Sequence, residues 1–189
     1  QVLAEKGYKG TSMLAVAKAA GASNETLYNW FGNKQGLLAA MIEENARTAS
    51  DVLGQVFIQE ENAAMPKTMQ RLELFGTALL DLLTSERSVA LNRAAAADVS
   101  TGGTLGALLS QHGRQKVMPL LAQTFEHAQK EGIIADHDTE EIAEIYVTLL
   151  LGDIQIRRVI GALQAPNAEN TLRHSQRVIE LILDLFGRK

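Results

Sequence analysis

Residues 11–34 read TSMLAVAKAAGASNETLYNWFGNK, and this stretch decides how the first part of the chain folds. The spacing of its apolar residues predicts a helix over 12–20, whose shared apolar face consists of Met13, Val16, Ala17 and Ala20. Gly21 suits a left-handed helix exit, because a residue without a Cβ adopts positive φ at little cost. Ser23 can cap a second helix over 23–30. Two short helices joined by a glycine-containing turn form a helix-turn-helix.

The second helix of this motif turns Leu27 inward, with Phe31 just beyond its end, and exposes mainly polar side chains. Short polar residues at a helix N-terminus let that end enter the major groove and meet base edges. The side chains that we expect to face DNA, together with the capping Ser23, are Asn24, Glu25, Thr26, Tyr28, Asn29 and Trp30. The donors that we expect to reach flanking phosphates are Thr11, Ser12, Tyr28, Trp30 and Lys34. The helix N-termini near Thr11, Ser23 and Lys34 add N–H groups and positive dipole.

Other interpretations of this stretch stay open. The two helices could form a hairpin packed inside a larger bundle, with no nucleic-acid partner. Glu25 and Asn29 are also compatible with an ordinary solvated helix face. The positions that we expect in the core under either interpretation are Met13, Val16, Leu27 and Phe31.

Helical spacing of apolar residues continues along the chain, which holds only three prolines and no sustained period-2 alternation. We therefore predict an all-α fold of about nine helices, over 1–6, 12–20, 23–30, 34–58, 66–84, 86–98, 111–131, 139–163 and 168–187. The 34–58 helix is long enough to bridge two domains. Asp138 and Glu141 form a capping box before the 139–163 helix, and Pro66 suits a first helical turn.

The motif residues carry a family resemblance at fixed spacing. They are Gly7-Tyr8, Thr11-Ser12-Met13, Val16-Ala17, Ala20-Gly21-Ala22-Ser23, Thr26-Leu27-Tyr28, Trp30-Phe31, Asn33-Lys34 and Leu37-Leu38. This set resembles the N-terminal DNA-binding domain of TetR-type transcriptional regulators. The resemblance implies a three-helix DNA-binding domain over 1–47 and a helical ligand-binding and dimerisation domain over 48–189. It also implies a repressor that binds a pseudo-palindromic double-stranded operator as a homodimer and is released by a small-molecule effector.

Two features depart from the family pattern. The family's first helix usually begins ten or more residues earlier, so we expect that residues 2–8 are its last turns and that a basic N-terminal arm is missing. Glu25 stands where the family often has a small residue. A carboxylate is unfavourable near phosphates, but it can accept a hydrogen bond from cytosine N4.

The formal net charge of the 189-residue chain is −4, which argues weakly against a nucleic-acid partner. Residues 1–47 hold five basic and four acidic side chains, for a charge of +1, whereas 48–189 carry −5. The acidic excess therefore lies outside the helix-turn-helix. Phosphate attraction must then come largely from helix dipoles, neutral donors and two-fold repetition of the site, so we expect salt-dependent binding with weak non-specific affinity.

The last predicted helix holds the run VIELILDLF over 178–186, in which seven of nine residues are apolar. A helix that is apolar on nearly all sides must be covered on two sides, and a partner subunit can cover the second one. With the 139–163 helix it would form a four-helix interface in the dimer. The interface residues that we predict are Ile142, Ile145, Leu149, Gly152, Ile160, Val178, Ile179, Ile182, Leu185 and Phe186. The alternative is that both helices are interior helices of a monomer.

The helices over 66–84, 86–98 and 111–131 are expected to enclose the effector. The candidate effector-binding residues are Met69, Phe75, Leu79, Asn92, Arg93, Met118, Phe125 and Tyr146, although each is also compatible with ordinary core or surface. A buried Arg93 would favour an anionic ligand. Nine aromatic residues in 189 do not indicate a broad aromatic-lined pocket.

No catalytic constellation or cofactor motif is present in this sequence. The chain has no cysteine, which excludes a disulfide framework, thiolate metal ligands and a Cys nucleophile. The Asp136-His137-Asp138 run is better explained as a loop and helix cap than as a metal site. Without an apolar run long enough for a membrane span or a signal peptide, we expect a cytoplasmic protein with no cofactor and no enzymatic activity. A dimeric adaptor without DNA recognition is the alternative function.

Overall fold

In a computed structural model, residues 2–56 and 67–188 are described, and they confirm the all-α fold, with a single isolated β-bridge between Ile134 and Gly187. The N-terminal helices are α1 (Val2–Gly10), α2 (Met13–Ala20), α3 (Asn24–Phe31) and α4 (Lys34–Val56). The others are α5 (Lys67–Thr84), α6 (Glu86–Asp98), a short 3₁₀ helix η1 (Val99–Thr101), α7 (Thr104–His112), α8 (Arg114–Lys130), α9 (Thr139–Leu151), α10 (Ile154–Val159) and α11 (Ala168–Phe186). No helix in the described part of the chain has the length and apolar character needed to cross a membrane.

Several predicted boundaries differ from the structure. The predicted 139–163 helix is interrupted at Gly152, whose φ of 44° ends α9 before α10 begins. The connection that we expected over 99–110 contains η1 and α7. Because α7 runs on to His112 and Gly113 follows it, the predicted 111–131 helix begins only at Arg114. The predicted first helix over 1–6 is broken where expected, at Gly7 (φ 65°), but one further turn follows to Gly10. The predicted helix start at Pro66 and the predicted end of the 34–58 helix lie outside the described residues.

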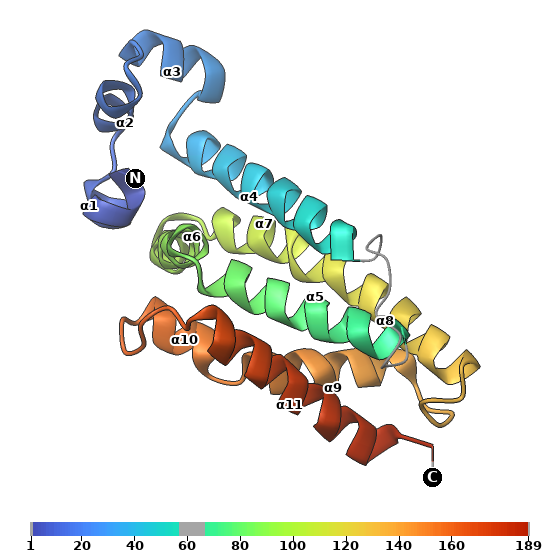
Figure 1. Cartoon of the computed structure of the whole chain (residues 1–189). Helices are drawn as coiled ribbons and strands as arrows, with labels where there is room; N and C mark the ends of the chain where they lie inside the picture. The colour runs from blue at the N-terminus through green and yellow to red at the C-terminus, as the bar shows by residue number, and fades with distance from the viewer. Residues whose placement is uncertain (1, 57–66, 189) are drawn as a thin grey trace.

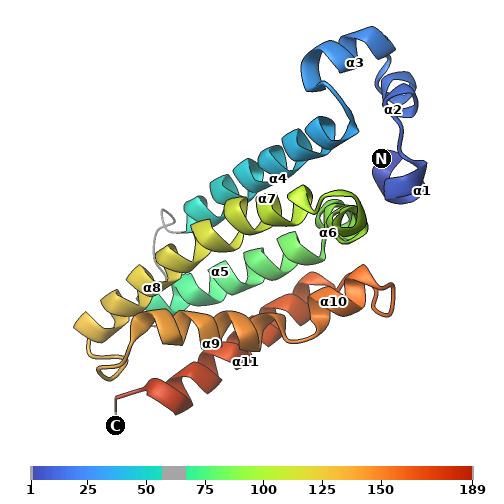
Figure 2. The same ribbon diagram turned by 180° about the vertical axis from the view of Figure 1, so that it is seen from behind.

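The helices form an elongated molecule with two distinct ends (Figure 1). Helices α1, α2 and α3, which we call the head, lie at one end, and α4 runs from the head along the remaining helices (Figures 1 and 2). Helices α5 to α11 form the body. In both views α4 lies on one side of the body and α11 on the opposite side, with α5 between them.

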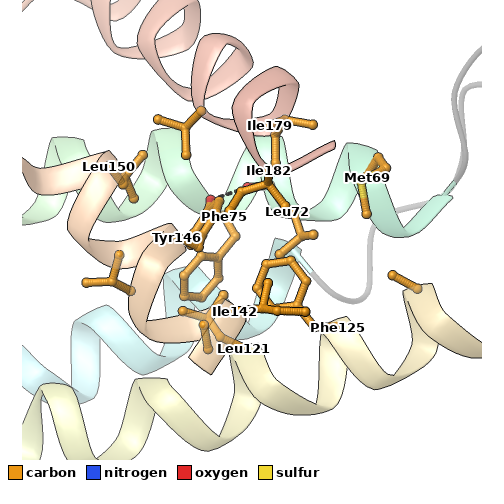
Figure 3. Close-up of a cluster of buried hydrophobic side chains, with 14 of the residues drawn as sticks. Met69, Leu72, Phe75, Leu121, Phe125, Ile142, Tyr146, Leu150, Ile179 and Ile182 are labelled. Atoms are coloured by element: carbon orange, nitrogen blue, oxygen red, sulfur yellow. Dashed lines mark hydrogen bonds between the residues drawn. The ribbon is translucent and has the colours of Figure 1, made fainter. Parts of the chain in front are cut away.

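The core of the body is built from α5, α8, α9 and α11 (Figure 3). Phe125 and Tyr146 meet edge to face with their ring centroids 5.8 Å apart, and the Tyr146 hydroxyl donates to the Leu72 carbonyl over 2.7 Å. A Cβ added at Gly76 would collide with the Ser175 and Tyr146 hydroxyl oxygens. The absence of a side chain at Gly76 therefore lets α9 and α11 pack closely against α5.

A second apolar cluster joins the head to the body. Leu3 of α1 and Leu38 and Ile42 of α4 are buried against a group from α6 and α7. That group consists of Ala90, Leu91, Ala94, Ala95 and Leu105. The small side chains of α6 allow α1 and α4 to approach closely, so the head is held against the body by packing as well as by the chain itself.

Candidate DNA-binding surface and ligand cavity

The turn between α2 and α3 has the geometry that the sequence predicts. Gly21 ends α2 in the left-handed conformation, with φ 65° and ψ 25°. Ser12 caps α2 by accepting from the Ala15 N–H over 3.2 Å, and Ser23 caps α3 by accepting from the Thr26 N–H over 3.0 Å. These local hydrogen bonds fix where the two helices begin.

The inner faces of the two helices pack against α4. Met13, Ala17 and Leu27 are buried there together with Leu37, as predicted for Met13 and Leu27. Val16 and Phe31, also expected in the core, are only partly buried and flank this cluster. Ala20, which we placed on the same apolar face, is exposed. The helix-turn-helix thus buries one face against α4 and leaves the opposite face exposed.

The outer side of α3 carries the expected mixture of polar and aromatic groups. The exposed members are Ser23, Asn24, Glu25, Tyr28, Asn29 and Trp30. Trp30 is 71% exposed, and its ring meets that of Phe31 edge to face with the ring centroids 6.2 Å apart. Thr26 is half-buried, with its hydroxyl 2.8 Å from that of Ser23. The structure therefore brings nearly all the predicted base-facing residues onto one exposed helix.

Two of the predicted phosphate donors are engaged inside the head instead. Thr11 is buried, at 3% exposed, and its hydroxyl donates to the Gly7 carbonyl over 2.7 Å. Lys34 Nζ donates to the Tyr8 carbonyl and lies 4.0 Å from the centroid of the Tyr8 ring. Partial burial lowers the pKa of Lys34. The Thr11 prediction is corrected on this ground, since a buried hydroxyl that already donates has no proton left for a phosphate, while Ser12 remains exposed.

A cavity of about 330 Å³ opens between α4 and the body. Its walls come from each α-helix from α4 to α10. The apolar wall residues are Ile42, Ala46, Leu79, Leu82, Leu83, Leu109, Val117, Met118, Val147 and Leu151. The other wall residues are Asn45, Ser88, Asn92, Ser110, His112, Gly113, Arg114 and Gln155. A cavity of this size and character is suited to a small, mainly apolar molecule.

Three of the eight predicted effector residues line this cavity, namely Leu79, Asn92 and Met118. Four others fill the core of the body and reach no cavity wall, namely Met69, Phe75, Phe125 and Tyr146. Arg93 is exposed and donates to the Val159 and Arg158 carbonyls, at 2.6 and 3.1 Å, so the premise of a buried Arg93 is wrong. The sequence shows that these side chains are inward, but not whether they meet atoms or empty space.

Sequence reasoning missed most of the cavity wall. The contribution of α4, from Ile42, Asn45 and Ala46, went unnoticed because that helix was assigned only a bridging role. Leu109 and Ser110 lie on α7, in a stretch that we expected to be a connection.

The predicted interface residues divide into two groups. Ile142, Val178, Ile179 and Ile182 are at most 2% exposed in the chain's own core, so their assignment to a partner surface is wrong. Ile145, Leu149 and Phe186 are partly buried, and Gly152, Ile160 and Leu185 are exposed. A Cβ added at Gly152 would meet nothing within 4 Å, so within the chain this glycine ends a helix and does not permit a close approach.

The Asp136-His137-Asp138 run is a loop and helix cap, as predicted. Asp138 accepts hydrogen bonds from the Glu140 and Glu141 N–H groups, at 2.9 and 3.4 Å. The His137 ring meets Phe186 edge to face at 5.2 Å. Across residues 2–56 and 67–188, no group of three potential metal-binding side chains is found.

Comparison with known proteins matches both parts of the chain. Residues 1–41 match the profile described as bacterial regulatory proteins, tetR family, and residues 70–188 match that of the AefR-like transcriptional repressor, C-terminal domain. A TetR transcriptional regulator from Agrobacterium tumefaciens is 30% identical, with a TM-score of 0.73 over 100% of this chain and 90% of that one. A putative TetR-family regulator from Mesorhizobium loti reaches a TM-score of 0.83 at 23% identity, over 98% of this chain and 91% of that one.

A curated relative points the same way. The HTH-type transcriptional repressor ComR of Escherichia coli (strain K12) is 27% identical over 154 residues, which are 78% of this chain and 70% of the relative. The helix-turn-helix geometry and the exposed α3 agree with the family profile that matches residues 1–41. The second profile extends the match over residues 70–188. The chain belongs to the TetR family of transcriptional regulators.

Proposed function

We propose that this regulator is a repressor that binds a pseudo-palindromic operator as a homodimer and leaves it when a small molecule occupies the cavity. The observation that carries this proposal is that α4 belongs to both sites. Its first residue, Lys34, comes shortly after the end of α3, which is the proposed recognition helix. Further along α4, Ile42, Asn45 and Ala46 line the cavity. We retain residues 1–47 as the proposed DNA-binding domain and 48–189 as the proposed ligand-binding and dimerisation domain.

In the proposed complex the N-terminal end of α3 enters the major groove. Asn24, Glu25 and Asn29 are exposed on α3 and carry the amide and carboxylate groups suited to base edges. Ser12, Tyr28 and Trp30 are exposed at its flanks, where they are suited to phosphate and sugar contacts. Lys34 already has a carbonyl partner, so a phosphate would have to share its ammonium group.

The proposed dimer uses the side of the body that lies away from α4. Ile160, directly after α10, and Leu185 of α11 are 67% and 60% exposed. Ile156 of α10 and Leu172 of α11 add further exposed apolar surface. Ile145 and Leu149 of α9 are only partly covered. Apolar groups at these positions favour a partner subunit, and two-fold symmetry would give the dimer two recognition helices for two half-sites.

Release follows from the position of α4 in the cavity wall. A ligand that fills the space between α4 and the body contacts Ile42, Asn45 and Ala46. Any resulting shift of α4 moves α3, because Leu27 and Leu37 are packed in one cluster. The two recognition helices of the dimer would then lose the spacing that two half-sites require.

The test is selection of genomic fragments by the full chain, followed by titration of the enriched duplex. We expect one enriched inverted repeat, affinity that falls steeply with salt, and a change in fluorescence of Trp30, the chain's single tryptophan. If no fragment is enriched while the chain is folded and dimeric, a dimeric adaptor replaces the repressor.

A second experiment tests the dimer surface. Ile160→Asp and Leu185→Asp should convert the dimer to monomer in analytical ultracentrifugation. Leu120→Asp, at a position of α8 that is 44% exposed, is the matched control and should stay dimeric. A dimer that survives both of the first two changes would place the interface elsewhere.

A further inference from the structure

The wall of the cavity is mainly aliphatic and carries no aromatic ring of Phe, Tyr or Trp and no carboxylate among its described residues. Ten of them are aliphatic or methionine side chains, contributed by α4, α5, α7, α8 and α9. Such a wall offers no aromatic face for stacking and no carboxylate for a cation. It is suited to a flexible hydrocarbon chain.

The one Lys or Arg side chain among the described wall residues, Arg114, lies at the junction of α7 and α8. His112 ends α7 and Arg114 begins α8, with Gly113 between them. No side chain caps the start of α8, so its positive end adds to the charge of Arg114. An anionic end group is therefore favoured at this junction and at no other part of the wall.

The polar groups on the α4 and α6 walls are already partly paired with each other. Asn45 Nδ2 donates to Ser88 Oγ over 3.3 Å, and Asn92 Nδ2 donates to the Ser88 carbonyl over 2.9 Å. These bonds reduce the cost of placing hydrocarbon beside the two amides. This wall does not require a second polar group on the ligand.

We propose that the cavity binds an aliphatic carboxylate, with its hydrocarbon chain along the apolar wall and its carboxylate at Arg114. The cavity of about 330 Å³ lies at the lower end of the range of small-molecule sites, which suits a hydrocarbon chain of medium length. This proposal rests on the proposed role of the cavity as the effector site and names the chemistry of its ligand.

Glu144 competes with the proposed ligand carboxylate for Arg114, which makes the proposal testable in both directions. Its guanidinium is paired with Glu144 of α9, and the two side chains are 50% and 51% exposed. Glu144 does not line the cavity. A ligand carboxylate would replace Glu144 as the partner of Arg114, so removing the Glu144 charge should strengthen carboxylate binding, and removing the Arg114 charge should weaken it.

The experiment compares four compounds by calorimetric titration of the full chain: decanoate, 1-decanol, decyltrimethylammonium and 2-naphthoate. We expect decanoate to bind about tenfold more tightly than decanol, because a charged hydrogen bond adds to the same hydrocarbon contact. Decyltrimethylammonium and 2-naphthoate should bind more weakly than decanol. Tightest binding by the cation or the aromatic compound would overturn the proposal.

Two variants separate the end group from the chain. Arg114→Met should reduce decanoate affinity about tenfold and leave decanol affinity unchanged. Glu144→Gln should raise decanoate affinity and again leave decanol unchanged. Equal effects on both compounds would overturn the placement of the carboxylate. Val117→Phe, which fills the cavity without changing charge, should weaken both compounds together.

The fate of the operator complex keeps this proposal distinct from the proposed function. Decanoate that binds and releases the selected duplex supports both. If a compound of another class occupies the cavity and releases the duplex while decanoate does not bind, the ligand class is wrong and the ligand-responsive repressor stands. If decanoate binds as described and the duplex is not released, the ligand class stands and the release mechanism is wrong.

Discussion

The hydroxyl of Tyr8 in α1 donates a hydrogen bond to the carboxylate of Asp98 at the end of α6, 3.0 Å away and ninety residues along the chain. The same carboxylate, which is fully buried, also accepts from Gln35 Nε2 of α4 at 3.1 Å. The Leu105 N–H and the Thr104 hydroxyl of α7 add bonds of 3.2 and 3.4 Å. One side chain therefore joins the head, α4 and the body.

We predict that Asp98→Ala lowers the free energy of unfolding by about 3 kcal/mol, because several donors lose their acceptor in a buried site. Urea denaturation followed by circular dichroism measures this loss. Asp81→Ala is the control, since Asp81 is exposed on α5, and it should change stability by less than about 0.5 kcal/mol. Equal losses for the two variants would show that Asp98 has no special role.

Gly76 supplies a second prediction, because its missing side chain makes room for two hydroxyl groups. Gly76→Ala should destabilise the chain by about 1–3 kcal/mol, since the core must expand to admit the methyl group. Gly106→Ala is the matched control. An added Cβ at Gly106 of α7 meets nothing within 4 Å, so this variant should gain about 0.5–1 kcal/mol from reduced freedom of the unfolded chain. Thermal denaturation should therefore shift in opposite directions for the two variants.

Tyr146 predicts how stability depends on alkaline pH. Burial raises the pKa of its hydroxyl above the ordinary value of 10.0. The stabilising contribution of the neutral Tyr146 hydroxyl is fully present below pH 10. Above pH 10 this hydroxyl ionises in the unfolded chain but stays neutral in the folded chain. Stability should then fall by up to ~1.4 kcal/mol per pH unit from this group alone.

The Tyr146→Phe variant isolates this effect. It should be less stable at neutral pH by about 1 kcal/mol, through loss of the bond to the Leu72 carbonyl. Between pH 10 and 11 its stability should fall less steeply than that of the parent. Parallel slopes for the parent and Tyr146→Phe would refute the prediction.

The proposed DNA contacts separate by their effect on sequence preference. Asn24→Ala should change which base is preferred at one position of each half-site, with about 1–3 kcal/mol of discrimination lost. Tyr28→Phe should weaken binding to every sequence by about 1 kcal/mol, because a phosphate donor carries no base information. Competition binding against a library of operator variants measures both. A uniform loss for Asn24→Ala would remove it from the base-reading group.

Features that depend on neighbouring residues could be predicted from the sequence. The caps at Ser23 and Asp138 and the left-handed turn at Gly21 arise from hydrogen bonds within three residues and from backbone sterics. The break at Gly152 was missed because a glycine inside a helix costs only about 1 kcal/mol, so good helix formers on both sides obscure it.

Features that depend on how helices meet were less predictable. Ile182 and Leu185 belong to the same apolar run, yet one is buried in the chain's own core and the other is 60% exposed. Thr11 has a small polar side chain typical of a surface, but the fold buries it beneath α1. The cavity wall combines seven helices, and nothing in a single helix shows that its apolar face meets empty space.

The apolar cluster that contains Leu3, Leu38 and Ile42 has a consequence for how the molecule denatures. Three of its eight buried residues belong to α1 and α4 and the other five to α6 and α7, so neither part can expose it without the other. We expect one cooperative melting transition, even though the family assigns the two ends separate tasks. Tolerance to mutation is then shared as well, because a substitution that destabilises α6 or α7 also lowers the stability of the helix-turn-helix end.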